Sequence, residues 1–106
     1  MKKVMPPKYA QKNAKKAKEC IKQGSKAMTS AGKKRMNELI QRKPLNLKDL
    51  QQIDSFSRHK DNAKYEGDIC KDKGAVAWLG WGYGFDNGKP SLKFKKWIKR
   101  KKEELK

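Results

Sequence analysis

The residues that could perform catalysis are few and scattered. The only histidine is His59, and a histidine acting as general base needs a hydrogen-bonded partner that the sequence does not indicate. Five acidic residues in the middle of the chain could bind a metal ion, but their spacing matches no calcium loop and no nuclease motif. These are Asp54, Asp61, Glu66, Asp68 and Asp72. We therefore expect no enzymatic activity, with His59 at the surface or capping a helix and the acids balancing nearby lysines.

The spacing of the cysteines and glycines indicates no cofactor either. Cys20 and Cys70 have no second cysteine or histidine nearby that would complete a metal-ligand set. The glycines from Gly80 to Gly88 form neither a dinucleotide-binding fingerprint nor a P-loop. We expect neither a cofactor nor a metal ion. The spacing leaves a disulfide between the two cysteines open, but no signal peptide is recognisable, so we expect reduced thiols.

Positive charge is the strongest feature of the sequence. Its 106 residues include 29 Lys and Arg against 11 Asp and Glu, a formal net charge of +18 at pH 7. Solubility of a small domain needs a net charge of only about 2 to 8, so the excess indicates a polyanionic partner. Residues 1–43 carry +12, residues 44–86 carry −1 and residues 87–106 carry +7. This distribution predicts a near-neutral core with two basic terminal segments.

Length and hydrophobic periodicity predict the fold. The chain has the length of one domain, and we treat residues 1–106 as a single helical domain. Prolines, glycines and N-capping residues separate segments with helical periodicity. Helices are expected over about residues 8–23, 31–43, 47–58, 74–81 and 92–105. The sequence therefore predicts an all-α, compact bundle of four to five short helices with lysine-rich N- and C-terminal helices.

The most hydrophobic segment, 74–81, is expected at the centre of the bundle, around Trp78 and Trp81. With Tyr83 and Phe85, these aromatic side chains could stack on unpaired bases, but core packing is favoured because the chain has few other large residues. Residues 60–72 are expected to form a loop and 82–88 a turn. The apolar run is too short for a transmembrane helix, which takes about 20 residues.

Lysines cover one side of the first and last predicted helices. In the helix over 8–23, apolar residues recur at an i, i+4, i+7, i+11 spacing and leave the lysines on the remaining face. In the helix over 92–105, Phe94, Trp97 and Ile98 share one side and basic residues the other. The candidate nucleic-acid-binding residues are Lys12, Lys15, Lys16, Lys22, Lys33, Lys34, Arg35, Lys95, Lys96, Lys99, Arg100 and Lys102.

Lys33, Lys34 and Arg35 fall in the first turns of the helix over 31–43, where basic side chains oppose the helix dipole. An anionic ligand near that N-terminus would remove the penalty, whereas a solvated charge run would need no ligand, and the sequence leaves both readings open. Most of the basic residues are lysines, which read bases less well than arginine does. We therefore expect weak sequence specificity.

Four short segments carry a resemblance to a known domain. They are S-A-G-K-K-R-M at 30–36, L-N-L at 45–47, S-F-S-R-H at 55–59 and A-V-A-W-L-G-W-G at 75–82. Together they resemble a small helical domain of largely uncharacterised role that recurs in proteins of tailed phages and large DNA viruses. The likeness covers roughly residues 6–82 and leaves out the lysine-rich end. It implies a viral protein located in the virion or inside the host cell, not a secreted one, and transfers no catalytic residues.

Three classes of partner remain after these exclusions. The leading expectation is a non-enzymatic protein that binds DNA or RNA through the phosphate backbone with low specificity. The alternative is a viral structural protein, such as a minor capsid or cement component, whose basic faces bind acidic capsid partners. An anionic membrane surface comes third, because a basic amphipathic helix can bind lipid head groups.

Overall fold

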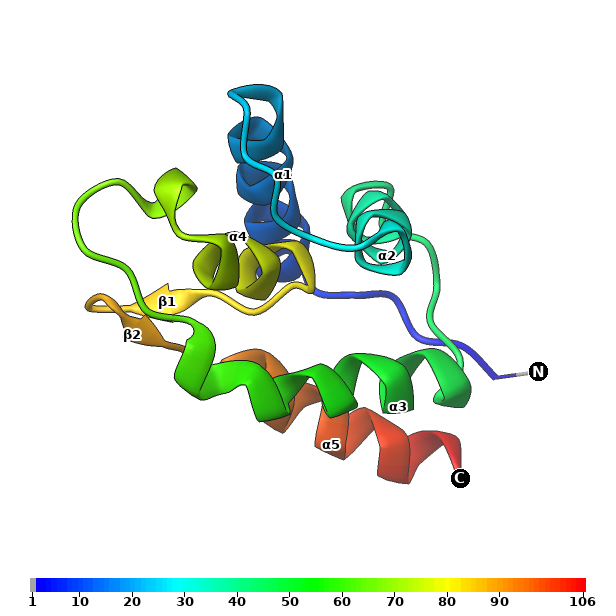
Figure 1. The fold of residues 1–106 in the computed structure, drawn as a ribbon. Helices are drawn as coiled ribbons and strands as arrows, with labels where there is room; N and C mark the ends of the chain where they lie inside the picture. The colour runs from blue at the N-terminus through cyan, green and yellow to red at the C-terminus, as the bar shows by residue number, and fades with distance from the viewer. Residues whose placement is uncertain (1) are drawn as a thin grey trace.

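The computed structural model describes residues 2–106 and confirms the all-α bundle (Figure 1). Five α-helices are joined by short connections that contain two 3₁₀ helices and a two-stranded hairpin. The elements are α1 (Lys8–Lys22), α2 (Ser30–Ile40), α3 (Leu47–Phe56), η1 (Ser57–Asn62), η2 (Ile69–Lys71), α4 (Lys73–Gly80), β1 (Phe85–Asp86), β2 (Lys89–Pro90) and α5 (Lys93–Leu105). Within the described residues, every helix is too short or too polar to cross a membrane.

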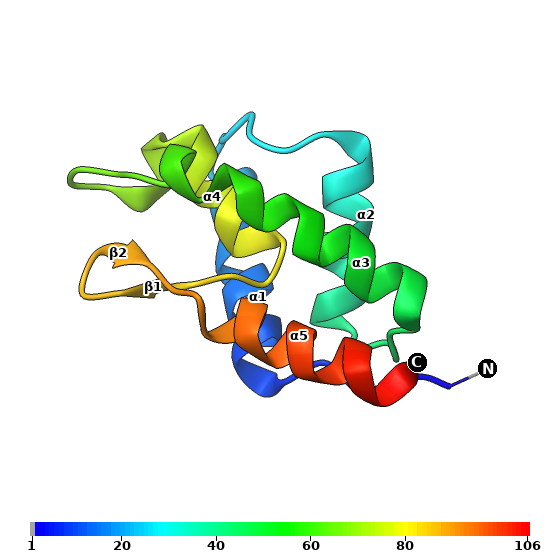
Figure 2. The same cartoon turned by 90° about the horizontal axis from the view of Figure 1, so that it is seen from below.

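The helices form two layers around α4. Helix α1 packs on α4 and α2, while α3 and α5 pack along each other below them (Figure 1). Viewed from below, α5 passes the beginning of α1, so the two lysine-rich helices come together at their N-terminal ends (Figure 2). This arrangement positions the candidate site.

Local signals set the helix ends close to the predicted positions. Asn46 and Asp49 form a capping box at the start of α3, in which each side chain accepts a hydrogen bond from the other residue's backbone N–H. Thr29 caps α2, and its side chain accepts a hydrogen bond from the backbone N–H of Gly32. Helix α2 ends at Ile40, before the predicted residue 43, because Arg42 adopts a positive φ of 51° and breaks the helix.

Two of the expected irregular segments are more regular than predicted. The predicted loop at 60–72 contains the end of η1 and all of η2. The predicted turn over 82–88 contains β1 and continues into an antiparallel hairpin, in which Phe85 pairs with Pro90. Asn87 and Gly88 both have positive φ, 51° and 79°, as the two-residue turn of a twisted hairpin requires.

The aromatic core lies where the sequence predicted it. Trp78 and Tyr83 are fully buried and stack with ring centroids 4.3 Å apart. Their polar atoms reach backbone carbonyls, since Trp78 Nε1 donates to Gly84 O at 2.9 Å and Tyr83 Oη to Ile53 O at 2.7 Å. Burial, with the nearby charge of Asp54, raises the pKa of Tyr83 far above its usual value. Trp78 therefore ties α4 to the segment before the hairpin, and Tyr83 ties that segment to α3.

A disulfide joins Cys20, at the end of α1, to Cys70 in η2. The expectation of reduced thiols is wrong in this structure. The fold brings the two Cα atoms to 4.9 Å, a separation that suits a disulfide, although the residues are 50 positions apart in the sequence. No local sequence pattern predicts this contact, because it depends on the tertiary packing of η2 against the end of α1.

Candidate nucleic-acid interface

Helices α1 and α5 meet through Tyr9. The Tyr9 ring lies edge-on to Phe94, with centroids 6.0 Å apart, and the Lys93 ammonium is 4.5 Å from the centre of the Tyr9 ring. Burial raises the pKa of Tyr9, and the positive charge of Arg100 partly offsets that shift. Two turns of α5 thus lie close to the first turn of α1. The structure brings the two basic helices together at this point.

The exposed cations next to this junction form one surface. On α1, Lys12 and Lys16 follow Tyr9 by three and seven positions and so lie on its side of the helix. On α5, Lys96 and Arg100 follow Lys93 by the same spacings. All five cations are exposed. We call this set the α1–α5 basic surface, and it consists of Lys12, Lys16, Lys93, Lys96 and Arg100.

Lys99 extends this surface. It is exposed and lies three positions after Lys96, on the outer side of α5. Within residues 2–106 no acidic side chain forms an ion pair with Lys99 or with any member of the α1–α5 basic surface. Glu103 lies beside these cations but forms its ion pair with Lys106, so positive charge remains in excess on this surface.

Other predicted nucleic-acid-binding residues lie along the edge where α1 faces α2. Lys18 Nζ donates to Asn37 Oδ1 at 3.3 Å, which marks the side of each helix that faces the other. Lys15 and Lys22 flank Lys18 at helical spacing, and Lys33 lies one turn before Asn37. These lysines are exposed and form a second basic group, while Lys34 is exposed on another side of α2.

Arg35 does not belong to either exposed group. It is 8% exposed, and its guanidinium forms ion pairs with Glu38 at 3.2 Å and with Asp49 at 3.1 Å. It also donates a hydrogen bond to the side chain of Gln52. Arg35 therefore links α2 to α3, and these acids, not a bound anion, neutralise it. Arg35 is therefore not part of the exposed basic surface.

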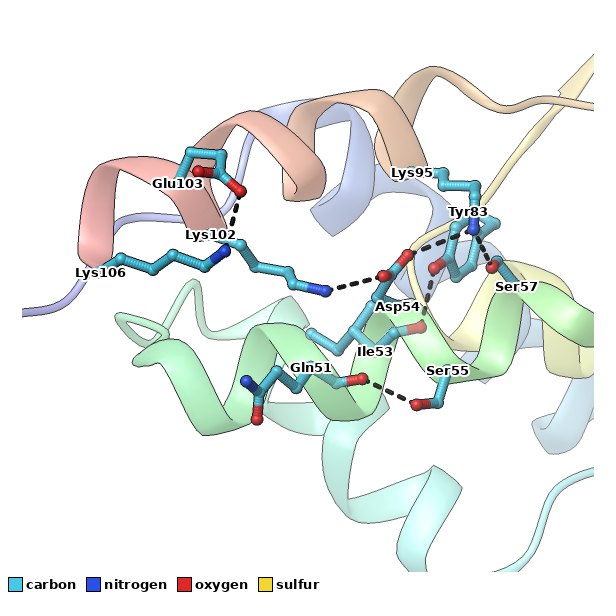
Figure 3. A network of polar contacts seen from close by, with 10 residues as sticks. All are labelled: Gln51, Ile53, Asp54, Ser55, Ser57, Tyr83, Lys95, Lys102, Glu103 and Lys106. Atoms are coloured by element: carbon cyan, nitrogen blue, oxygen red, sulfur yellow. Dashed lines mark hydrogen bonds and ion pairs between the residues drawn. The ribbon is translucent and has the colours of Figure 1, made fainter.

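Lys95 and Lys102 also have internal partners (Figure 3). They hold the two oxygens of the Asp54 carboxylate, at 3.4 Å and 3.0 Å respectively, and Lys95 also donates to Ser57 Oγ at 2.7 Å. Burial raises the pKa of Asp54, but the hydrogen bonds and charges of the two lysines outweigh burial and lower it. These two predicted binding residues thus fasten α5 to α3.

Replacing Asp54 with asparagine should lower the free energy of unfolding at pH 7 by about 1–2 kcal/mol. Because the folded-state pKa lies below the unfolded value of about 3.9, the contribution is complete above that pH and is lost as the pH falls through the folded-state pKa. Urea unfolding of wild type and Asp54→Asn should therefore differ at pH 7, and the difference should shrink as the pH falls below about 3.9. A difference that stays constant below that pH would contradict the role given to the carboxylate.

Sequence reasoning missed two residues of this site, Tyr9 and Lys93. A signal for Lys93 existed, since it precedes Lys96 and Arg100 by three and seven positions and begins the same helical row. Tyr9 had no such signal, because its contact with Phe94 joins opposite ends of the chain.

Within residues 2–106, no group of three or more His, Cys, Asp or Glu side chains is arranged to hold a metal ion. Comparison of the chain with known protein families, with curated proteins and with solved structures finds no match. The resemblance to a domain of phages and large DNA viruses stays a prediction, and function has to be inferred from the surface itself.

Proposed function

We propose that this protein binds nucleic acid through the phosphate backbone, with little sequence preference, on the α1–α5 basic surface. One observation carries the proposal: cations from both ends of the chain adjoin at the Tyr9–Phe94 contact, and within residues 2–106 none of the five forms an ion pair with an acid. Adjoining charges act on one polyanion at the same time. Each phosphate that they neutralise releases condensed counterions, which favours binding.

The residue types support backbone binding over base reading. Four of the five cations in the α1–α5 basic surface are lysines, which act as point charges on flexible stems. Contacts to phosphate set the position of a protein on nucleic acid but carry no sequence information. We therefore infer low specificity and an affinity that depends strongly on salt.

Viral origin and location in the virion remain predictions. The disulfide favours an oxidising environment, and virion surfaces are among the places where disulfides persist. The alternative partner, an acidic capsid protein, would use the same cations but would not need the regular phosphate spacing of nucleic acid.

Fluorescence anisotropy with labelled duplex DNA between 50 and 200 mM salt tests the proposal. Five phosphate contacts predict a slope of log K against log salt of about −4.5, and hence about a 500-fold loss of affinity over this range. Polyglutamate of equal charge serves as the comparison. Absence of DNA binding at 50 mM salt would contradict the proposal, and so would tighter binding to polyglutamate, which would support the acidic-protein partner.

A further inference from the structure

A small pocket opens beside the α1–α5 basic surface, between the first turn of α1, the hairpin and the first turn of α5. Its volume is about 160 Å³. Pockets for drug-sized ligands measure about 300–1,000 Å³, so this one suits a single planar group. Its lining includes the aromatic residues Tyr9 and Phe85 and the polar residues Asn13, Asp86 and Lys93.

Hydrogen bonds and packing hold the pocket in shape. Asn13 Nδ2 donates to Gly82 O at 3.0 Å, which fixes the amide and leaves its oxygen as an acceptor. The backbone N–H of Ser91 donates to Gly84 O at 2.7 Å and closes the base of the hairpin. Tyr65 packs edge-on against Phe85, with centroids 5.1 Å apart. A preformed pocket of this kind loses little entropy when it takes a ligand.

Asp86 is the feature that phosphate binding does not explain. It is exposed, it lines the pocket, and within residues 2–106 no cation forms an ion pair with it. A carboxylate beside a phosphate-binding surface repels phosphate. The same carboxylate is an acceptor-only group that suits a ligand with N–H donors.

We propose, on the basis of the proposed function, that this pocket takes one unpaired nucleobase and that Asp86 selects guanine. Guanine presents two adjacent donors, N1–H and N2–H, which a carboxylate can accept in a bidentate pair. Adenine and cytosine present one exocyclic amino group, and thymine presents one donor between two carbonyl oxygens that a carboxylate repels. The cations of the adjoining surface hold the phosphates on either side of the base.

The base takes the position over the Tyr9 ring that the Lys93 ammonium occupies in the free protein. A cation–π contact at an exposed site contributes about two- to fivefold in affinity, whereas stacking of a base on an aromatic ring contributes about five- to 150-fold. The base therefore displaces Lys93 from the ring, and the flexible lysine can then pair with a neighbouring phosphate.

Anisotropy with two single-stranded oligonucleotides of about twelve residues tests the proposal: oligothymidine, and the same strand with one central guanine. Wild type should bind the guanine strand about tenfold more tightly. Asp86→Asn should abolish this preference and bind oligothymidine as tightly as wild type or more tightly, because it removes a negative charge. Asparagine is also accepted in turns, so the hairpin is retained.

Asp61→Asn is the matched control, since Asp61 is also exposed and unpaired among the described residues but lies in η1 outside this pocket. It should keep the guanine preference. Equal wild-type affinities for the two strands, with steep salt dependence, would overturn the pocket and leave the proposed function standing. Loss of the preference in Asp61→Asn as well would also overturn the role of Asp86. Absence of binding to both strands and to duplex DNA would overturn the proposed function itself.

Discussion

Replacing Lys12, Lys16, Lys96 and Arg100 together with glutamine should weaken binding to duplex DNA by about 10²–10⁴-fold at 50 mM salt. The four side chains are exposed and form no ion pair among the described residues, so their loss leaves the core intact. Each lost phosphate contact should reduce the salt slope by about 0.9, which brings it from about −4.5 to about −1. A salt series by anisotropy measures both quantities.

A second quadruple variant controls for net charge. Lys48, Lys60, Lys64 and Lys71 are exposed lysines of the near-neutral segment 44–86, and their replacement with glutamine removes the same charge. This control should keep most of the affinity and most of the salt slope. Equal losses in the two variants would mean that binding follows net charge, and would contradict a defined surface formed by α1 and α5.

Replacing Cys20 and Cys70 with alanine should lower the free energy of unfolding by about 2–4 kcal/mol. The disulfide closes a loop of about 50 residues, for which restriction of the unfolded chain alone gives about 4 kcal/mol. The connected segment, 57–72, has little core of its own, since Ala63 is its only buried residue. Denaturant unfolding with and without reductant measures the effect.

The alanine variant also provides the control for reduction. Reductant should lower the unfolding midpoint of wild type to that of the variant and leave the variant unchanged. Hydrogen exchange should show the largest loss of protection in 57–72 and at the start of α4, where Asp72 accepts from the N–H of Ala75. DNA binding should persist, because Cys20 lies at the opposite end of α1 from Tyr9. An unchanged midpoint in wild type would contradict the stabilising role of the disulfide.

The helices were predictable because their signals are local. Prolines, glycines, N-capping residues and helical periodicity placed all five α-helices within about three residues of their ends. The central position of Trp78 followed from the scarcity of other large apolar residues. Both kinds of evidence concern neighbours in the sequence or the composition of the chain, which a sequence displays directly.

The candidate site was only partly predictable, because the roles of its cations depend on partners far away in the chain. Arg35 belongs to the same K-K-R run as Lys33 and Lys34. The two acids that pair with it are Glu38, one turn later in α2, and Asp49 in α3. The position of Arg35 four residues before the buried Leu39 was a usable signal that it faces inward. For Lys95 and Lys102, whose common partner Asp54 lies more than 40 positions earlier, no local signal existed.

The placement of Asp54 and the two partners of Arg35 has a consequence for how salt acts on this molecule. Asp49 and Asp54 pair with cations between helices, so the exposed faces of α1 and α5 carry a large excess of positive charge, although Glu19, Glu103 and Glu104 are also exposed there. Mutual repulsion of these charges opposes the compact state, and dissolved ions screen it over about 10 Å at 0.1 M. Salt that releases the protein from a polyanion therefore also relieves the strain of its own charge, so the unbound fold is most stable under the conditions in which it binds least.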